Sequence, residues 1–135
     1  MNKILIVTGG SRGIGAATAK LAAAQGYQVC VNYLINQQAA DAVVADIRSA
    51  GGTAVAMQAD LAVEAEIVAL FERVDQELGP LTALVNNAGI TQDNLAMRMK
   101  DEEWSSVIDT NLSAVFRLAR GVLRPMMKAK GGRII

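Results

Sequence analysis

The stretch Thr8-Gly9-Gly10-Ser11-Arg12-Gly13-Ile14-Gly15 decides the fold. The apolar run before it, residues 4–7, predicts a strand that is buried on both faces. The Ala-rich run after it, residues 16–24, predicts a helix, and Gly26 is suited to end that helix. Because the glycines lie between a buried strand and a helix start, backbone N–H groups and the positive end of the helix dipole can hold a phosphate there.

The spacing of Gly9, Gly13 and Gly15 is Gly-x-x-x-Gly-x-Gly, which differs from the common dinucleotide pattern Gly-x-Gly-x-x-Gly. The physical needs are similar: a sharp turn, a close approach of the backbone to a pyrophosphate, and close packing of the helix on the strand. The alternative is that a strand–helix turn needs these glycines for its geometry alone. The strand before the loop and the helix after it favour phosphate binding.

Composition narrows the classes of protein that this chain can belong to. A length of 135 residues, of which 52% are hydrophobic and 4% aromatic, predicts one domain, residues 1–135, with an aliphatic core. Thirteen basic and thirteen acidic residues give a formal net charge of zero, which argues against binding to nucleic acid or to an anionic membrane. The sequence shows no membrane-spanning run and no signal peptide, so we expect a cytoplasmic protein.

Cysteine and histidine content limits the chemistry. The single cysteine, Cys30, excludes an internal disulfide and is expected to be a buried, inert residue. The chain has no histidine, which removes Ser-His-Asp and Cys-His catalysis and most zinc sites, so we predict no metal site. Any chemistry must rest on hydroxyls, amides, lysines, carboxylates or a bound cofactor.

Apolar patterns along the rest of the chain alternate between strand and helix. We expect strands at 28–32, 53–58, 81–85 and 133–135. We expect helices from Asn36, a possible N-cap, to about residue 50, then over 64–78, and from about residue 101 to 126. Pro125 should kink or interrupt the last helix. Alternating strands and helices predict a parallel α/β sheet with helices on both faces.

Polar residues gather where the expected strands end: the glycine loop, Asn32, Asp60-Leu61 and Asn86-Asn87-Ala88-Gly89. Parallel sheets bind ligands beyond the carboxyl ends of their strands, so these residues predict one nucleotide site. A site for NAD usually has an acidic residue at the end of the second strand, where this chain has the neutral Asn32, and Arg12 could pair with a 2′-phosphate. Both features favour NADP. The alternatives are a solvated arginine at position 12 and a helix cap at Asp60.

These motifs together resemble the short-chain dehydrogenase/reductases: residues 8–15, Asp60-Leu61, residues 86–89 and Asn111 occur in the order of that family. Residues 85–135, above all 89–104, are more narrowly similar to the bacterial 3-oxoacyl-[acyl-carrier-protein] reductases. The resemblance covers the whole chain and implies a Rossmann-like doubly wound sheet of strand order 3-2-1-4-5. It also implies NADPH-dependent reduction of a ketone to an alcohol, in a homo-oligomer that packs through the long helix.

The resemblance also implies roles for individual residues. The loop Gly9, Gly10, Ser11, Arg12, Gly13, Ile14 and Gly15 would hold the pyrophosphate and the 2′-phosphate of NADP(H), and Asn32 would lie by the adenosine ribose. Asp60 and Leu61 would lie by the adenine, with Asp60 accepting a hydrogen bond from its amino group, and Asn87, Ala88 and Gly89 would lie along the nicotinamide ribose. Asn111 would be the active-site asparagine, which holds a helix kink and a water of the proton relay; an ordinary mid-helix polar residue is the alternative.

One departure from the family pattern concerns the proton donor. The family uses a Ser and a Tyr-x-x-x-Lys beyond the fifth strand, and we expect the fold to be truncated there. Neither Tyr27 nor Tyr33 has a lysine four residues later. We therefore keep two further hypotheses: an NADP-binding module without catalysis, and a dimerising structural protein. Lys128, Lys130 and Arg133 form a basic patch that could dock an acyl carrier protein, or simply suit a helix C-terminus.

Overall fold

The computed structural model describes residues 3–135, which form one parallel sheet of five strands. The strands are β1 (Lys3–Val7), β2 (Tyr27–Tyr33), β3 (Thr53–Gln58), β4 (Ala83–Val85) and β5 (Arg133–Ile134). Their order in the sheet is β3-β2-β1-β4-β5, with β1 at the centre, and every pairing is parallel. The predicted α/β class and strand order are therefore confirmed.

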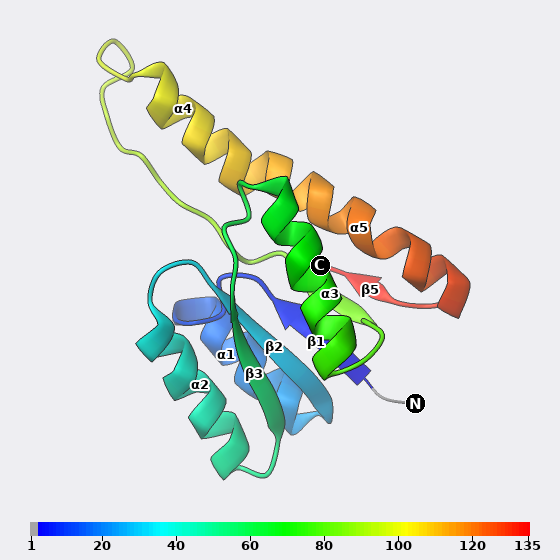
Figure 1. Ribbon diagram of the computed structural model, residues 1–135. Helices are drawn as coiled ribbons and strands as arrows, with labels where there is room; N and C mark the ends of the chain where they lie inside the picture. The colour runs from blue at the N-terminus through cyan, green and yellow to red at the C-terminus, as the bar shows by residue number, and fades with distance from the viewer. Residues whose placement is uncertain (1–2) are drawn as a thin grey trace.

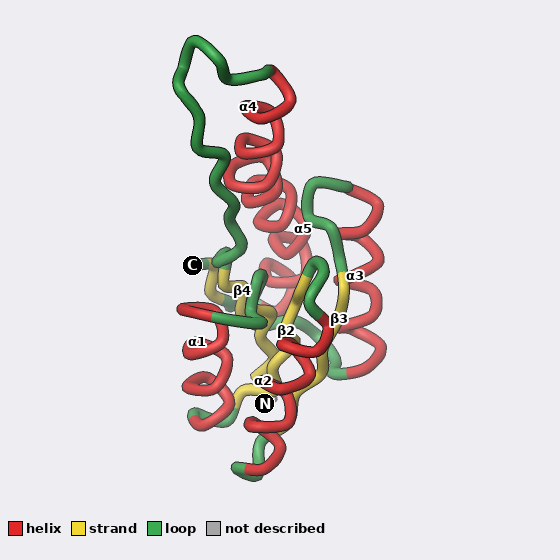
Figure 2. Tube along the Cα trace, turned by 90° about the vertical axis from the view of Figure 1, so that its left-hand side faces the viewer, coloured by secondary structure: helices red, strands yellow, loops and turns green. Residues whose placement is uncertain are grey.

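Helices cover both faces of this sheet (Figure 1). One face carries α1 (Gly13–Ala24) and α2 (Gln37–Ser49), and the other carries α3 (Glu64–Glu77) and α5 (Ala114–Ala129). Figure 2 shows the sheet between these two layers. The short helix α4 (Asp101–Ile108) and the loop before it extend away from the sheet in both views, and a π-helical turn, η1 (Asp109–Ser113), joins α4 to α5.

The core has two parts, because successive side chains of a strand point to opposite faces of the sheet. Leu5 and Val7 of β1 pack under α1 and α2, whereas Ile4 and Ile6 pack under α3 and α5. All four side chains are buried, as the continuous apolar run of the sequence predicts. Cys30 is also fully buried, as expected, and lies in the α3/α5 part of the core.

The start of α2 shows why local sequence predicts this element well. The Asn36 side chain accepts a hydrogen bond of 2.9 Å from the backbone N–H of Ala39, which confirms the expected N-cap. Val43, Val44 and Ile47 follow at helical spacing and are buried against the sheet.

Of the two expected effects of Pro125, a kink or an interruption of the last helix, the interruption is wrong. Helix α5 continues through Pro125 to Ala129, and the departure from α-helical geometry lies earlier, at η1. Proline removes the hydrogen bond to the carbonyl of Gly121, but both residues are exposed, so water can take the place of the missing donor. None of the helices within residues 3–135 combines the length and the apolar character that crossing a bilayer requires.

Candidate functional site

Four loops meet at the carboxyl ends of the strands and line one cavity of about 570 Å³. They are the glycine loop after β1, the residues after β2, the residues after β3 and the residues after β4. Nearly all the residues predicted to bind a cofactor line this cavity: Gly9, Ser11, Arg12, Gly13, Ile14, Asn32, Asp60, Leu61, Asn87, Ala88 and Gly89. Gly10, Gly15 and Asn111 do not line it, but each of them contacts a residue that does.

The glycines of the loop meet different physical needs. Gly9 has a φ of 59°, and a Cβ placed there would lie 2.9 Å from the Cα of Ala88. Gly15 is buried, and a Cβ placed there would lie 2.5 Å from the carbonyl oxygen of Gly9. Gly13 has a φ of 56° and faces open space. The loop therefore needs glycine both for its own geometry and to leave room beside the start of α1.

The start of α1 is free of side-chain caps. Arg12 precedes the helix, and its side chain makes no capping hydrogen bond. The N–H groups of the first helical turn have no intrahelical acceptors, and the helix dipole adds positive potential at the same place. An anion in the cavity would find these donors directed toward it.

Thr8 and Asn87 hold the glycine loop against the loop that follows β4. The hydroxyl oxygen of Thr8 accepts hydrogen bonds from the backbone N–H groups of Asn87 (2.9 Å) and Ala88 (3.0 Å). The side-chain nitrogen of Asn87 donates to the carbonyl oxygens of Thr8 (3.1 Å) and Gly9 (3.0 Å). Sequence reasoning gave Thr8 no such role. The feature that could have indicated it is a hydroxyl side chain directly after an apolar strand.

The end of β2 lies one residue later than the sequence predicted. The strand ends at Tyr33, and because alternate side chains face opposite sides, Tyr33 packs on the α1/α2 side while Asn32 lies on the α3/α5 side with Cys30. The carboxamide of Asn32 is buried and hydrogen-bonded within the protein. Tyr33 is half-buried and also lines the cavity, and sequence reasoning did not name it as a site residue.

Asp60 is not a helix cap, because α3 begins at Glu64 and the residue preceding it is Val63. Its carboxylate instead accepts a hydrogen bond of 3.0 Å from the backbone N–H of Ala62, which forms an Asx turn. Its own N–H donates to the Glu66 carboxylate at 3.0 Å. These two contacts hold the half-buried carboxylate at the cavity, where Asp60 and Arg12 are the charged members of the lining within residues 3–135.

Asn111 lies in the π-helical turn and contacts the loop after β4. Its carboxamide accepts a hydrogen bond from the N–H of Ile90 and donates one to the carbonyl of the same residue, both at 2.8 Å. Ile90 lines the cavity, so Asn111 acts at the cavity margin through Ile90. An ordinary mid-helix residue would make no such reciprocal pair with a distant loop.

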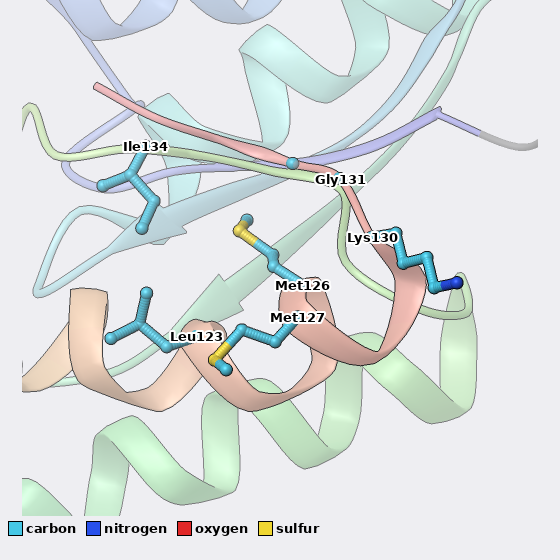
Figure 3. Close-up of a pocket in the computed structure, with 7 residues that line it drawn as sticks. Leu123, Met126, Met127, Lys130, Gly131 and Ile134 are labelled. Carbon is cyan, nitrogen blue, oxygen red and sulfur yellow. The ribbon is translucent and has the colours of Figure 1, made fainter.

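A second hollow, of about 360 Å³, lies between the end of α5 and β5. Its walls are Leu123, Met126, Met127 and Ile134, with Gly131 and Gly132 at the turn, and Lys130 extends its ammonium group away from it (Figure 3). The hollow therefore offers apolar surface and no converging polar groups, in contrast to the cavity at the strand ends.

Comparison with known proteins agrees with this geometry. A family model described as short chain dehydrogenase matches residues 3–135. A 3-oxoacyl-[acyl-carrier-protein] reductase of Synechocystis sp. is 49% identical over 133 residues, which are 98% of this chain and 54% of that protein. A reductase of the same name from Staphylococcus epidermidis is 46% identical over 135 residues, which are 100% of this chain and 55% of that protein. Another, from Escherichia coli, is 47% identical over 133 residues, which are 98% of this chain and 53% of that protein.

The chain thus spans about half the length of the curated relatives it matches. The match covers every loop that lines the cavity, including the glycine loop and the residues after β4. The chain belongs to the short-chain dehydrogenase family.

Proposed function

We propose that this chain forms the nucleotide-binding part of an NADPH-dependent reductase that acts on 3-oxoacyl groups attached to an acyl carrier protein. The observation that carries the proposal is the single cavity that the glycine loop, Asp60 and residues 87–89 line together. The identity of 46–49% with reductases of that name supports the substrate class. We propose a cytoplasmic location, because a protein whose lone cysteine, Cys30, is free and buried does not depend on an oxidising compartment.

The residues present fit a dinucleotide. The uncapped N-terminus of α1 and Ser11 would hold the pyrophosphate, and the left-handed Gly13 leaves space for its close approach. Asp60 would hold the adenine, and Asn87, Ala88 and Gly89 would lie along the nicotinamide ribose. When bound, the cofactor would supply a hydride, and the protein residues would bind and orient the cofactor.

A preference for the 2′-phosphorylated cofactor follows from charge. The last residues of β2, Asn32 and Tyr33, carry no acid that would bond the ribose hydroxyls of NAD and repel a phosphate. Arg12 is exposed at the cavity and can pair with a phosphate through two N–H groups.

Neither tyrosine of the chain has the surroundings of a proton donor. Tyr27 lies at the start of β2, at the other end of the strand from the cavity, with the Lys3 ammonium 5.5 Å from its ring centre. Tyr33 lies at the cavity, and the residue four positions later is Gln37. We therefore propose that these 135 residues bind the cofactor but reduce no ketone by themselves. In the whole reductase, Asn111 would assist the reaction by holding Ile90 at the margin of the cavity.

The first experiment is a calorimetric titration of the 135-residue chain with NADPH and with NADH. Micromolar binding with a clear preference for NADPH would support the cavity as its site. Binding of neither cofactor would overturn the proposal and leave a scaffold or dimerising protein. Activity on a 3-oxoacyl thioester that appears only when the second half of a relative is added would distinguish a reductase from a binding module.

A docking surface for the carrier protein is part of the proposal. Lys128, Lys130 and Arg133 are all exposed around the end of α5, and Lys130 caps that helix in a left-handed conformation. Carrier proteins with acidic surfaces would be attracted to this patch. We expect Lys130→Glu to weaken carrier-protein binding about tenfold at low salt. Lys100→Glu, the same charge change at an exposed lysine before α4, at the opposite end of the α4–η1–α5 segment, is the control. Equal effects of both variants would contradict the docking site.

The proposed enzyme is a homo-oligomer. Leu112, Phe116, Leu123 and Met127 are exposed and lie along one side of η1 and α5 at helical spacing. An apolar stripe of this kind on a helix is typical of an interface between subunits.

A further inference from the structure

Asn32 is a buried carboxamide whose hydrogen bonds link separate strand ends. Its exposed fraction is 2%, and within residues 3–135 Thr8 is the other buried polar side chain of the core. The side-chain oxygen accepts a hydrogen bond from the N–H of Gly9 at 3.2 Å. The side-chain nitrogen donates to the carbonyl oxygens of Met57 at 3.3 Å and Ala59 at 3.4 Å.

Two of these partners, Gly9 and Ala59, lie in the two loops that would bind opposite parts of a nucleotide, and Met57 lies in β3. Gly9 belongs to the glycine loop, and Ala59 immediately precedes Asp60. The main-chain carbonyl of Asn32 adds a further link, because it accepts a hydrogen bond of 2.9 Å from the N–H of Gly10. One residue of β2 thereby connects the end of β1 to the end of β3.

The chemistry of these contacts requires an amide. Gly9 presents an N–H donor, whereas Met57 and Ala59 present carbonyl acceptors. The side chain between them therefore needs one acceptor atom and two N–H donors, which a carboxamide group has. Aspartate would offer acceptors alone and would place charge against two carbonyl oxygens. Leucine, of similar size, would remove all three side-chain hydrogen bonds and offer the Gly9 N–H no acceptor.

We propose that Asn32 is a positioning residue that sets the separation between the glycine loop and Asp60. In this role its carboxamide does not bind the cofactor; it holds the phosphate-binding and adenine-binding loops at the spacing of one dinucleotide. The inference rests on the proposed function, since it concerns the same cavity. A preorganised pair of loops binds a ligand that spans both more tightly, because no free energy is spent on aligning them.

The test uses Asn32→Leu and Asn32→Asp, with Val122→Ala as the matched control, because Val122 is equally buried but lies on α5. We expect both Asn32 variants to raise the Kd for NADPH at least about tenfold. Their Kd for adenosine, which can reach Asp60 but carries no phosphate for the glycine loop, should stay within about twofold. Val122→Ala should be less stable than the wild type and keep its Kd for both ligands.

A second readout does not depend on cofactor binding. Hydrogen exchange of the Gly9 amide should become faster in Asn32→Leu, which offers that N–H no acceptor, and should stay slow in Val122→Ala. Asn32→Ser is the replacement variant if Asn32→Leu does not fold. Wild-type affinity for NADPH in folded Asn32 variants, or an equal loss of affinity for both ligands, would overturn the proposal. Failure of the wild type to bind NADPH or NADH would count against the proposed function, while the Gly9 amide would still test the link.

Discussion

Gly15 shows how tightly the glycine loop is packed. An added Cβ would lie 2.5 Å from the carbonyl oxygen of Gly9 and 3.0 Å from the Cα of Gly10, both backbone atoms that cannot move independently. We expect Gly15→Ala to lower the free energy of unfolding by about 1–3 kcal/mol and to abolish NADPH binding. Gly131→Ala is the control, because a Cβ there meets nothing within 4 Å. Denaturant unfolding and calorimetry measure both effects, and a neutral Gly15→Ala would contradict this packing.

Cys30 links burial to pH dependence. Burial raises the pKa of its thiol from 9.0 to about 12, while Arg73 lowers the pKa and Glu77 raises it to a smaller extent. Because the folded pKa is the higher one, the stabilisation is complete below pH 9 and is lost as the pH rises from 9 towards 12. We expect the free energy of unfolding to fall in that range by about 1.4 kcal/mol per pH unit more than in Cys30→Ala. Urea denaturation at several pH values measures the difference, and parallel curves for the two proteins would contradict it.

At the scale of elements, the π-helical turn η1 is tied to the loop after β4. Two hydrogen bonds of 2.8 Å between Asn111 and Ile90 hold this loop. We expect Asn111→Ala to speed hydrogen exchange of the Ile90 amide about five- to tenfold, since that N–H loses its acceptor. Asn111→Asp, which keeps an acceptor, should leave it slow. Asn94→Ala, which alters hydrogen bonds farther along the same loop, is the control; equal protection in all variants would show that η1 does not hold the loop.

For the whole molecule, the exposed apolar side chains are not equivalent. Leu112 is 62% exposed within the stripe of η1 and α5, and Leu21 is 64% exposed on α1, on the other face of the sheet. We expect Leu112→Glu to shift the protein from an oligomer to a monomer in analytical ultracentrifugation, because a charge would be buried in the subunit interface. Leu21→Glu should leave the sedimentation coefficient unchanged. A monomeric wild type, or loss of association in both variants, would count against the stripe as the interface.

Local sequence determined the elements of this protein. The apolar run 4–7, the Asn36 cap and the helical spacing of Val43 and Ile47 each predicted an element that the structure contains. These signals act over a few residues, because a strand alternates with period two and a helix with period 3.6. The same periodicity, with the order of strands and helices, predicted one parallel sheet with the glycine loop and Asp60 at one edge.

Tertiary structure alone decided what the polar residues at that edge do. Asn32 bonds partners that are 23, 25 and 27 positions away, and Asn111 bonds Ile90 across 21 positions. The one-residue extension of β2 to Tyr33, and the continuation of α5 through Pro125, were likewise not visible in local patterns. A hydrogen bond of this kind depends on which strands become neighbours in the sheet. The number of residues between two positions in the sequence does not determine that.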